Sequence, residues 1–169
     1  LHLVKAYATL SNNGKEVFPT LQLNKKSQTN KILQNEYSSH FFLNLLRSVV
    51  LKTEYTGPRV KVEGYQVGGK TGTSELLNPK GGYYKDRNLT SFIGIFPINK
   101  PKYVIYTAIE YPKKEQGTKQ KMTGARVNAP LVKDIIINII KLFNIPKNNK
   151  EEILKADTNS LYKQFNASI

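Results

Sequence analysis

The most chemically specific residues lie in one short stretch, residues 64–75, which reads Gly-Tyr-Gln-Val-Gly-Gly-Lys-Thr-Gly-Thr-Ser-Glu. Within it, Lys70 and the hydroxyl side chains of Thr71 and Thr73 are separated only by Gly72. An ammonium group and hydroxyl groups placed so closely together can bind an anion. Two kinds of anion site are compatible with the pattern, a phosphate loop and a strand that binds a carboxylate.

The first alternative is a phosphate loop, because Gly64, Gly69, Lys70 and Thr71 match G-x-x-x-x-G-K-[ST]. Such a loop follows a buried parallel strand and opens a helix whose N-terminal amides face the phosphate. Here residues 78–82, Asn-Pro-Lys-Gly-Gly, follow closely, and this turn-forming composition would end a helix within roughly two turns. A phosphate-loop NTPase therefore requires a helix directly after Thr71.

The second alternative is an extended strand over residues 67–75 at the edge of a cleft. Successive side chains of a strand point to opposite faces, so Thr71 and Thr73 would share one face and Lys70 would lie on the other. Because Gly72 has no side chain, a peptide could pair with this backbone as an added strand. The hydroxyls would then hold a carboxylate, and a strand amide would supply half of an oxyanion hole.

Helical patterns before and after this stretch supply elements that could position it. Residues 36–52 carry apolar side chains at helical spacing and give the clearest helix. Residues 3–10 predict a second helix that stops at Asn12-Asn13-Gly14, a good left-handed terminus. An apolar run over residues 131–143 predicts a third helix, with Pro130 in its first turn.

Strand patterns fill the segments between those helices. Residues 91–96 and 103–110 predict an antiparallel hairpin joined by the short turn 97–101. Residues 59–63 alternate like a half-buried strand, and residues 17–23 suggest a short extended segment. Residues 76–89 are polar and predict a long loop. These strands are predicted to be joined by a hairpin turn and not by a helix. They therefore cannot form the parallel βαβ unit of nucleotide-binding folds.

Composition narrows the function classes. The chain has 169 residues and a formal net charge of +14, but its lysines are scattered, which favours compositional bias over a nucleic-acid-binding face. It contains no cysteine, which excludes disulfides and thiolate chemistry. No apolar run approaches the ~20 residues of a membrane helix. His40 falls on the helical stripe of residues 36–52 with only His2 as another histidine, so a structural role is favoured and neither a catalytic triad nor a metal site is expected.

Residues 64–75, together with Lys-Gly-Gly-Tyr-Tyr at 80–84 and Thr-Ser-Phe-Ile-Gly-Ile-Phe-Pro at 90–97, resemble the penicillin-binding proteins. These are the serine D,D-transpeptidases, and the likeness is greatest to the division-specific branch of class B. Residues 3–15 resemble the helix and turn that precede this motif in the family. Residues 123–130 resemble the segment that closes the domain. The resemblance covers residues 1 to about 143. It implies an α+β fold like that of the serine β-lactamases, in which an antiparallel sheet packs against helices.

The resemblance also implies a division of the chain and a set of site residues. Residues 1–146 would be the C-terminal portion of a transpeptidase domain, and residues 147–169 would be a polar tail. Lys70 would place positive charge near the serine, the hydroxyls of Thr71 and Thr73 would bind the substrate carboxylate, and Gly72 would admit the peptide backbone. The Thr73 amide would join the oxyanion hole. No metal or organic cofactor is implied.

The partners implied by the resemblance are peptidoglycan stem peptides, β-lactam antibiotics and, through the parent enzyme, cell-division membrane proteins. No nucleic acid is expected. The location implied is the periplasmic face of the bacterial inner membrane, with an anchor in a segment absent from this chain.

The family's other motifs are expected outside this chain. The nucleophile belongs to Ser-x-x-Lys, and the copy formed by Ser160 and Lys163 lies in the polar tail, after the last core element. Ser11-Asn12-Asn13 matches Ser-x-Asn but is predicted to end a helix. The isolated chain is therefore expected to be inactive. A noncatalytic remnant of a split transpeptidase gene stays an alternative.

Overall fold

The computed structural model describes residues 1–24, 36–113 and 121–147. The elements follow in the order α1 (His2–Ser11), α2 (Glu36–Lys52), α3 (Gly57–Val60), β1 (Gly68–Leu77), β2 (Tyr83–Phe96), β3 (Tyr103–Glu110) and α4 (Gly124–Phe143). An antiparallel sheet packed against helices confirms the expected α+β class. In the described part of the chain, no helix combines the length and apolarity needed to cross a membrane.

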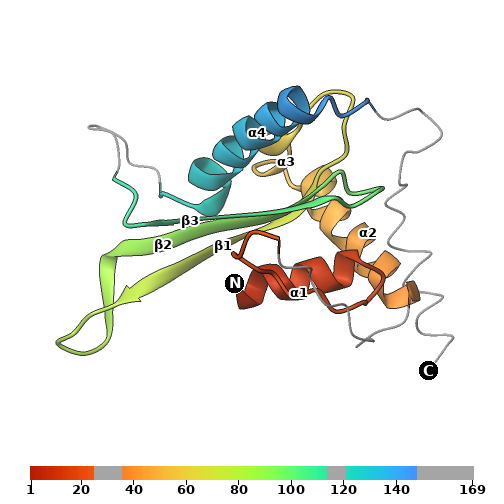
Figure 1. Ribbon diagram of the computed structural model, residues 1–169. Helices are drawn as coiled ribbons and strands as arrows, with labels where there is room; N and C mark the ends of the chain where they lie inside the picture. The colour runs from red at the N-terminus through yellow and green to blue at the C-terminus, as the bar shows by residue number, and fades with distance from the viewer. Residues whose placement is uncertain (25–35, 114–120, 148–169) are drawn as a thin grey trace, which may run out of the picture.

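The three strands form one antiparallel sheet in the order β1-β2-β3, so β1 is an edge strand within the described residues. Helix α4 covers one face of this sheet, and helices α1 and α2 lie on the other side (Figure 1). The hairpin predicted around residues 97–101 is confirmed, since β2 ends at Phe96 and β3 begins at Tyr103. The helix predicted over residues 36–52 is also confirmed.

The core lies on both faces of β2, because its side chains alternate. Phe92 and Phe96 are buried in one cluster with Ala129, Val132 and Ile136 of α4. Burying an aromatic or branched side chain of this size stabilises the fold by roughly 1.5–3 kcal/mol. This packing holds helix α4 against the Phe92 and Phe96 face of the sheet. The first turn of α4 contacts β1 on the same face.

The opposite face of the sheet is packed by α2. Ile95 of β2 and Ile98, just beyond it, are buried together with Leu43 and Leu46 of this helix. Gly68 at the start of β1 lies against the same layer, since a Cβ there would come within 2.5 Å of the Ile98 side chain. The two cores therefore fix both faces of the sheet near the beginning of β1.

The strand predicted over residues 59–63 is wrong, because Gly57–Val60 form the short helix α3. Pro58 stands in the first turn of α3, where its missing N–H costs nothing. The chain packs so closely on α2 that a Cβ at Gly57 would lie 2.2 Å from the Val50 carbonyl oxygen. This tertiary contact overrides the alternation of residues 59–63. Residues 17–23, where a short extended segment was predicted, include no residue of a β-strand.

The long loop predicted over residues 76–89 is also wrong, because β1 extends to Leu77 and β2 begins at Tyr83. The turn between them uses Gly81 and Gly82 at positive φ and a hydrogen bond from the Asn78 amide to the Gly82 carbonyl, 2.9 Å long. The strands are polar because this part of the hairpin projects beyond the helices into solvent (Figure 1). A strand that buries little carries no apolar alternation.

Helix α4 begins earlier than predicted, at Gly124, so the expectation of Pro130 in its first turn is wrong. Pro130 stands inside the helix and removes one backbone hydrogen bond. Buried packing of the flanking Ala129 and Val132 against the sheet compensates for that loss. The end of α1 agrees with the prediction, since Asn13 and Gly14 have φ of 53° and 74°.

Candidate functional site

Lys70, Thr71, Gly72 and Thr73 all lie on β1, one of the two edge strands of the described sheet. Their β2 partners are Ile93, Phe92, Ser91 and Thr90, in that order. Because the backbone is extended from Gly68 to Leu77, no helix follows Thr71. The phosphate-loop alternative is therefore excluded, and the extended backbone expected around Lys70 is confirmed.

The two hydroxyls and the ammonium group leave β1 on opposite faces, as the alternation predicted. Thr71 lies opposite Phe92, whose ring belongs to the core beneath α4. Lys70 lies opposite Ile93, and the next residue on that face of β2, Ile95, packs against α2. Thr71 and Thr73 thus face the side of α4, and Lys70 faces the side of α2.

The side chain of Lys70 is exposed and curls back along its own strand. Its Nζ donates a hydrogen bond of 2.8 Å to the backbone carbonyl oxygen of Thr71. This contact brings the ammonium group to a carbonyl of the residue that carries the first hydroxyl. The ammonium group therefore lies beside the backbone of the strand segment that carries the two hydroxyls.

The hydroxyl of Thr73 meets the N-terminus of α4. The backbone N–H of Gly124 donates to the Thr73 Oγ1 atom over 3.3 Å, while the N-cap residue Thr123 makes no side-chain cap. The hydroxyl thus accepts from one first-turn amide and keeps its own hydrogen available for another acceptor. The helix end carries a partial charge of roughly +0.5, so an anion is favoured beside this hydroxyl.

A very close approach of α4 to the sheet makes that contact possible. A Cβ on Gly124 would lie 2.3 Å from the Ser91 carbonyl oxygen and 2.9 Å from the Gly72 carbonyl oxygen. Only glycine lets the first turn rest on the backbone of β1 and β2. Sequence reasoning did not single out Gly124, although threonine followed by glycine before an apolar helix is a plausible helix start.

Arg47 of α2 is a second residue that sequence reasoning did not single out. Its side chain is half-buried, and its Nη1 donates a 2.9 Å hydrogen bond to the carbonyl oxygen of Val67. Burial lowers the pKa of the Arg47 guanidinium, which nevertheless stays charged because arginine ordinarily titrates far above neutral pH. The contact holds the residue that immediately precedes β1.

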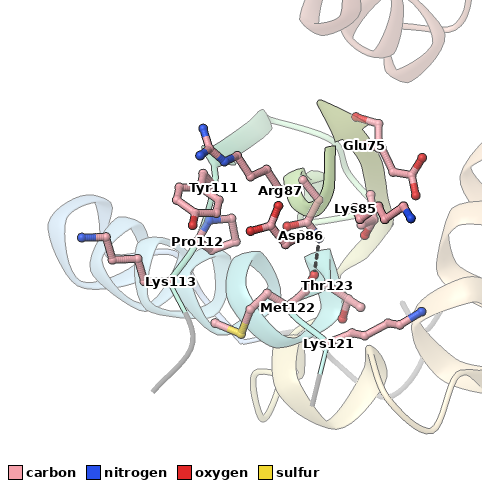
Figure 2. Close-up of a pocket in the computed structure, with 13 residues that line it drawn as sticks. Glu75, Lys85, Asp86, Arg87, Tyr111, Pro112, Lys113, Lys121, Met122 and Thr123 are labelled. Carbon is pink, nitrogen blue, oxygen red and sulfur yellow. Dashed lines mark hydrogen bonds between the residues drawn. The ribbon is translucent and has the colours of Figure 1, made fainter. Parts of the chain in front are cut away.

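A cavity of about 720 Å³ opens beyond Thr73, between the β1–β2 hairpin and the segments that follow β3 and precede α4 (Figure 2). Asn88 of β2 connects its walls. Its Nδ2 donates to the Met122 carbonyl oxygen over 2.6 Å, and its own carbonyl accepts from the Tyr111 amide over 2.8 Å. Thr73 itself lines the cavity, so the cavity begins where the strand segment with the two threonine hydroxyls ends.

The other candidate motifs do not join this site in the described chain. Ser11, Asn12 and Asn13 end α1, with the Ser11 hydroxyl donating to the Tyr7 carbonyl, which agrees with a helix-stop role. Ser160 and Lys163 lie outside the described residues. Within the described ranges, no three His, Cys, Asp or Glu side chains are grouped so that they could hold a metal ion.

The family to which known proteins with similar sequences belong can now be compared with this site. A family model described as the penicillin-binding protein transpeptidase domain matches residues 1–136. The peptidoglycan D,D-transpeptidase FtsI homolog of Chlorokybus atmophyticus is 37% identical over 116 residues, which cover 69% of this chain and 16% of the relative. The homolog of the same name from Mesostigma viride is 32% identical, covering 86% of this chain and 27% of the relative.

Among solved structures, penicillin-binding protein 3 from Mycobacterium tuberculosis, complexed with aztreonam, superposes with a TM-score of 0.66 at 26% identity. The match covers 87% of this chain and 36% of that structure. The present chain therefore spans well under half the length of the proteins that it matches.

Proposed function

Because the chain belongs to the penicillin-binding protein transpeptidase domain family, we propose that it forms the C-terminal part of a peptidoglycan D,D-transpeptidase. In the complete enzyme, a serine Oγ attacks the penultimate D-Ala carbonyl of a stem peptide, and the terminal D-Ala leaves as the amine. An amine of a neighbouring stem peptide then attacks the acyl-serine, which forms the cross-link and releases the serine. A β-lactam acylates the same serine.

The observation that carries this proposal is the edge strand with its two hydroxyls next to the N-terminus of α4. We place the terminal carboxylate of the stem peptide against the hydroxyls of Thr71 and Thr73. The Thr73 hydroxyl has a hydrogen to donate because its oxygen already accepts from Gly124. The helix end and the Lys70 ammonium add positive potential there. Gly72 leaves the backbone open to the peptide.

The oxyanion would be stabilised by the backbone amide of Thr73. In an antiparallel strand, the N–H and C=O of one residue point to the same side, and the side alternates along the chain. The Thr71 carbonyl receives the Lys70 ammonium, in keeping with an outward-facing Thr71 and, two residues on, an outward-facing Thr73. One such donor lowers the barrier by about 3 kcal/mol.

The remaining groups would come from parts of the enzyme beyond this chain. We propose that the serine belongs to a Ser-x-x-Lys motif of the longer protein, or of a partner polypeptide if the gene is split. Because the substrate of the complete enzyme would be peptidoglycan, we propose that the enzyme acts at the periplasmic face of the inner membrane. A membrane anchor in another segment would hold it there. Contacts with cell-division membrane proteins would also be made by the parent enzyme.

Carboxylate recognition can be tested on the 169-residue chain itself. We expect an N-acyl-D-Ala-D-Ala peptide to bind about 10-fold more tightly than its C-terminal amide, because only the carboxylate receives charge-assisted hydrogen bonds. NMR titration measures both dissociation constants. Thr73→Val should abolish the preference and Thr73→Ser should keep it. Ser74→Ala, a hydroxyl deletion on the other face of β1, is the control. Equal affinities in the wild-type chain would contradict the proposal.

The isolated chain should not react covalently with penicillin, because we assign the nucleophile to another segment. Intact-mass measurement after incubation with benzylpenicillin should show only the unmodified chain, both for the wild type and for Ser160→Ala. A stoichiometric adduct on the wild-type chain that disappears in Ser160→Ala would instead make Ser160 the nucleophile. An adduct retained in that variant would point to another residue of this chain.

A further inference from the structure

The tip of the β1–β2 hairpin carries two large apolar side chains that lie outside the core. Leu77 of β1 is 72% exposed, and Tyr83 of β2 is 60% exposed. The two residues are direct partners in the register of the strands, so their side chains lie next to each other on one face of the hairpin. Because the hairpin projects beyond the helices at this end, the pair is presented to solvent (Figure 1).

The turn that joins the two strands is ordered by its own hydrogen bonds. The carbonyl oxygen of Asn78 accepts from the Gly81 amide over 2.8 Å, and its side-chain oxygen accepts from the Lys80 amide over 3.0 Å. Gly81 and Gly82 have positive φ, as this turn requires. The ring of Tyr83 is therefore attached to a defined backbone, which loses little conformational entropy when a ligand binds.

The apolar surface of this pair is small, which limits what can bind there. A stable protein–protein interface buries roughly 800 Å² on each partner. Leu77 and Tyr83 are only two side chains, and the turn next to them carries the polar Asn78 and the charged Lys80. A single sugar ring is about as large as a tyrosine ring. Its C–H groups pack against the electron-rich face of an aromatic ring while its hydroxyl groups stay in water, so a sugar fits this surface.

The place of the pair along β1 relates it to the proposed substrate. With the terminal carboxylate of the stem peptide at Thr71 and the scissile carbonyl at the Thr73 amide, the preceding residues of the peptide run along β1 toward Leu77, where the strand ends. A strand rises about 3.3 Å per residue, so Leu77 lies roughly 13 Å beyond Thr73. In peptidoglycan, the amino end of each stem peptide is attached to a sugar of the glycan strand. That sugar would therefore arrive at the tip of the hairpin.

We propose that the tip of the β1–β2 hairpin binds the glycan strand of peptidoglycan, with one sugar ring stacked on Tyr83 and its edge against Leu77. This inference rests on the proposed function. The phenol hydroxyl of Tyr83 can exchange hydrogen bonds with the hydroxyl and acetamido groups of the sugar. Strand β1 would thereby bind both ends of one stem peptide, with the carboxylate at Thr71 and Thr73 and the sugar at the hairpin tip.

Two pairs of peptides that all end in D-Ala-D-Ala test this assignment on the 169-residue chain. One pair is a muramyl pentapeptide and the same pentapeptide with an acetyl group in place of the sugar, and the other is the corresponding pair of tripeptides. In NMR titrations, we expect the muramyl pentapeptide to bind about 10-fold more tightly than the acetyl pentapeptide. The shift changes that depend on the sugar should concentrate in residues 77–84. The two tripeptides should bind equally, because the sugar of the shorter peptide would stop short of Tyr83.

Variants of one residue assign the preference to the hairpin tip. Tyr83→Ala should remove the preference for the muramyl pentapeptide, whereas Tyr83→Phe should keep most of it because the face of the ring is retained. The matched control is Tyr55→Ala, because Tyr55 is 61% exposed but lies between α2 and α3. This control should keep the full preference. Both tyrosines are exposed, so all three variants should stay folded, as their NMR spectra report.

Equal affinities of the two pentapeptides, a preference that survives Tyr83→Ala, or the same effect of the sugar in the tripeptides would overturn the assignment. Self-association of the chain that Tyr83→Ala abolishes would also overturn it, because the tip would then contact a second copy. If both pentapeptides bound equally and only with a free C-terminal carboxylate, the proposed transpeptidase function would stand without this site. If neither pentapeptide bound, both proposals would fall together.

Discussion

Replacing Lys70 by alanine should lower the rate of acylation by penicillin roughly 10²–10³-fold in an enzyme that also contains the serine. The reason is electrostatic, because the ammonium group at the edge of β1 is the charge we place beside the reacting serine and the substrate carboxylate. The measurement is the second-order rate constant of acylation by a fluorescent penicillin, determined with the complete enzyme or with the reconstituted parts.

The same substitution should leave the fold intact. Lys70 is exposed, and its one described hydrogen bond is to the neighbouring Thr71 carbonyl, so the free energy of unfolding should change by less than ~0.5 kcal/mol. Lys80→Ala, in the exposed turn of the same hairpin, is the control and should acylate normally. An acylation rate unchanged by Lys70→Ala would remove this residue from the proposed mechanism.

Gly124→Ala should destabilise the chain by about 3–4 kcal/mol, combining overpacking with the loss of a helix cap. The added Cβ would lie 2.3 Å from the Ser91 carbonyl oxygen and 2.9 Å from the Gly72 carbonyl oxygen. Both are backbone atoms of the sheet and cannot rotate away. Helix α4 would have to lift from β1, which would break the Thr73 hydrogen bond. Urea unfolding followed by circular dichroism gives the free energy.

Gly81→Ala separates this clash from ordinary glycine effects. Gly81 has φ of 105° and no atom within 4 Å of an added Cβ, so its replacement adds only backbone strain. That strain is worth roughly 1–2 kcal/mol. If the two variants lost the same free energy of unfolding, the close contact of α4 with the sheet would not be the determinant that we infer. A Gly124→Ala chain that stays folded should also lose affinity for the C-terminal carboxylate.

Sequence reasoning failed in two segments, each for its own physical reason. The predicted strand at residues 59–63 became α3 because the chain is packed against Val50 of α2. The polar residues 76–89 were predicted as a loop because an exposed hairpin has no apolar alternation to reveal it. The cavity residues Asp86 and Arg87 fell within that supposed loop, so no local signal could have brought them together with Tyr111.

The amino-acid sequence by itself determined the family, the extended backbone at Lys70, and the placement of Thr71 and Thr73 on the opposite face. These properties follow from neighbouring residues, because alternation along a strand is a property of the backbone alone. The tertiary structure alone decided that α4 rests on Gly72 and Ser91 and that its first amide binds the Thr73 hydroxyl. That bond joins residues 51 positions apart, and such a contact depends on how whole elements pack.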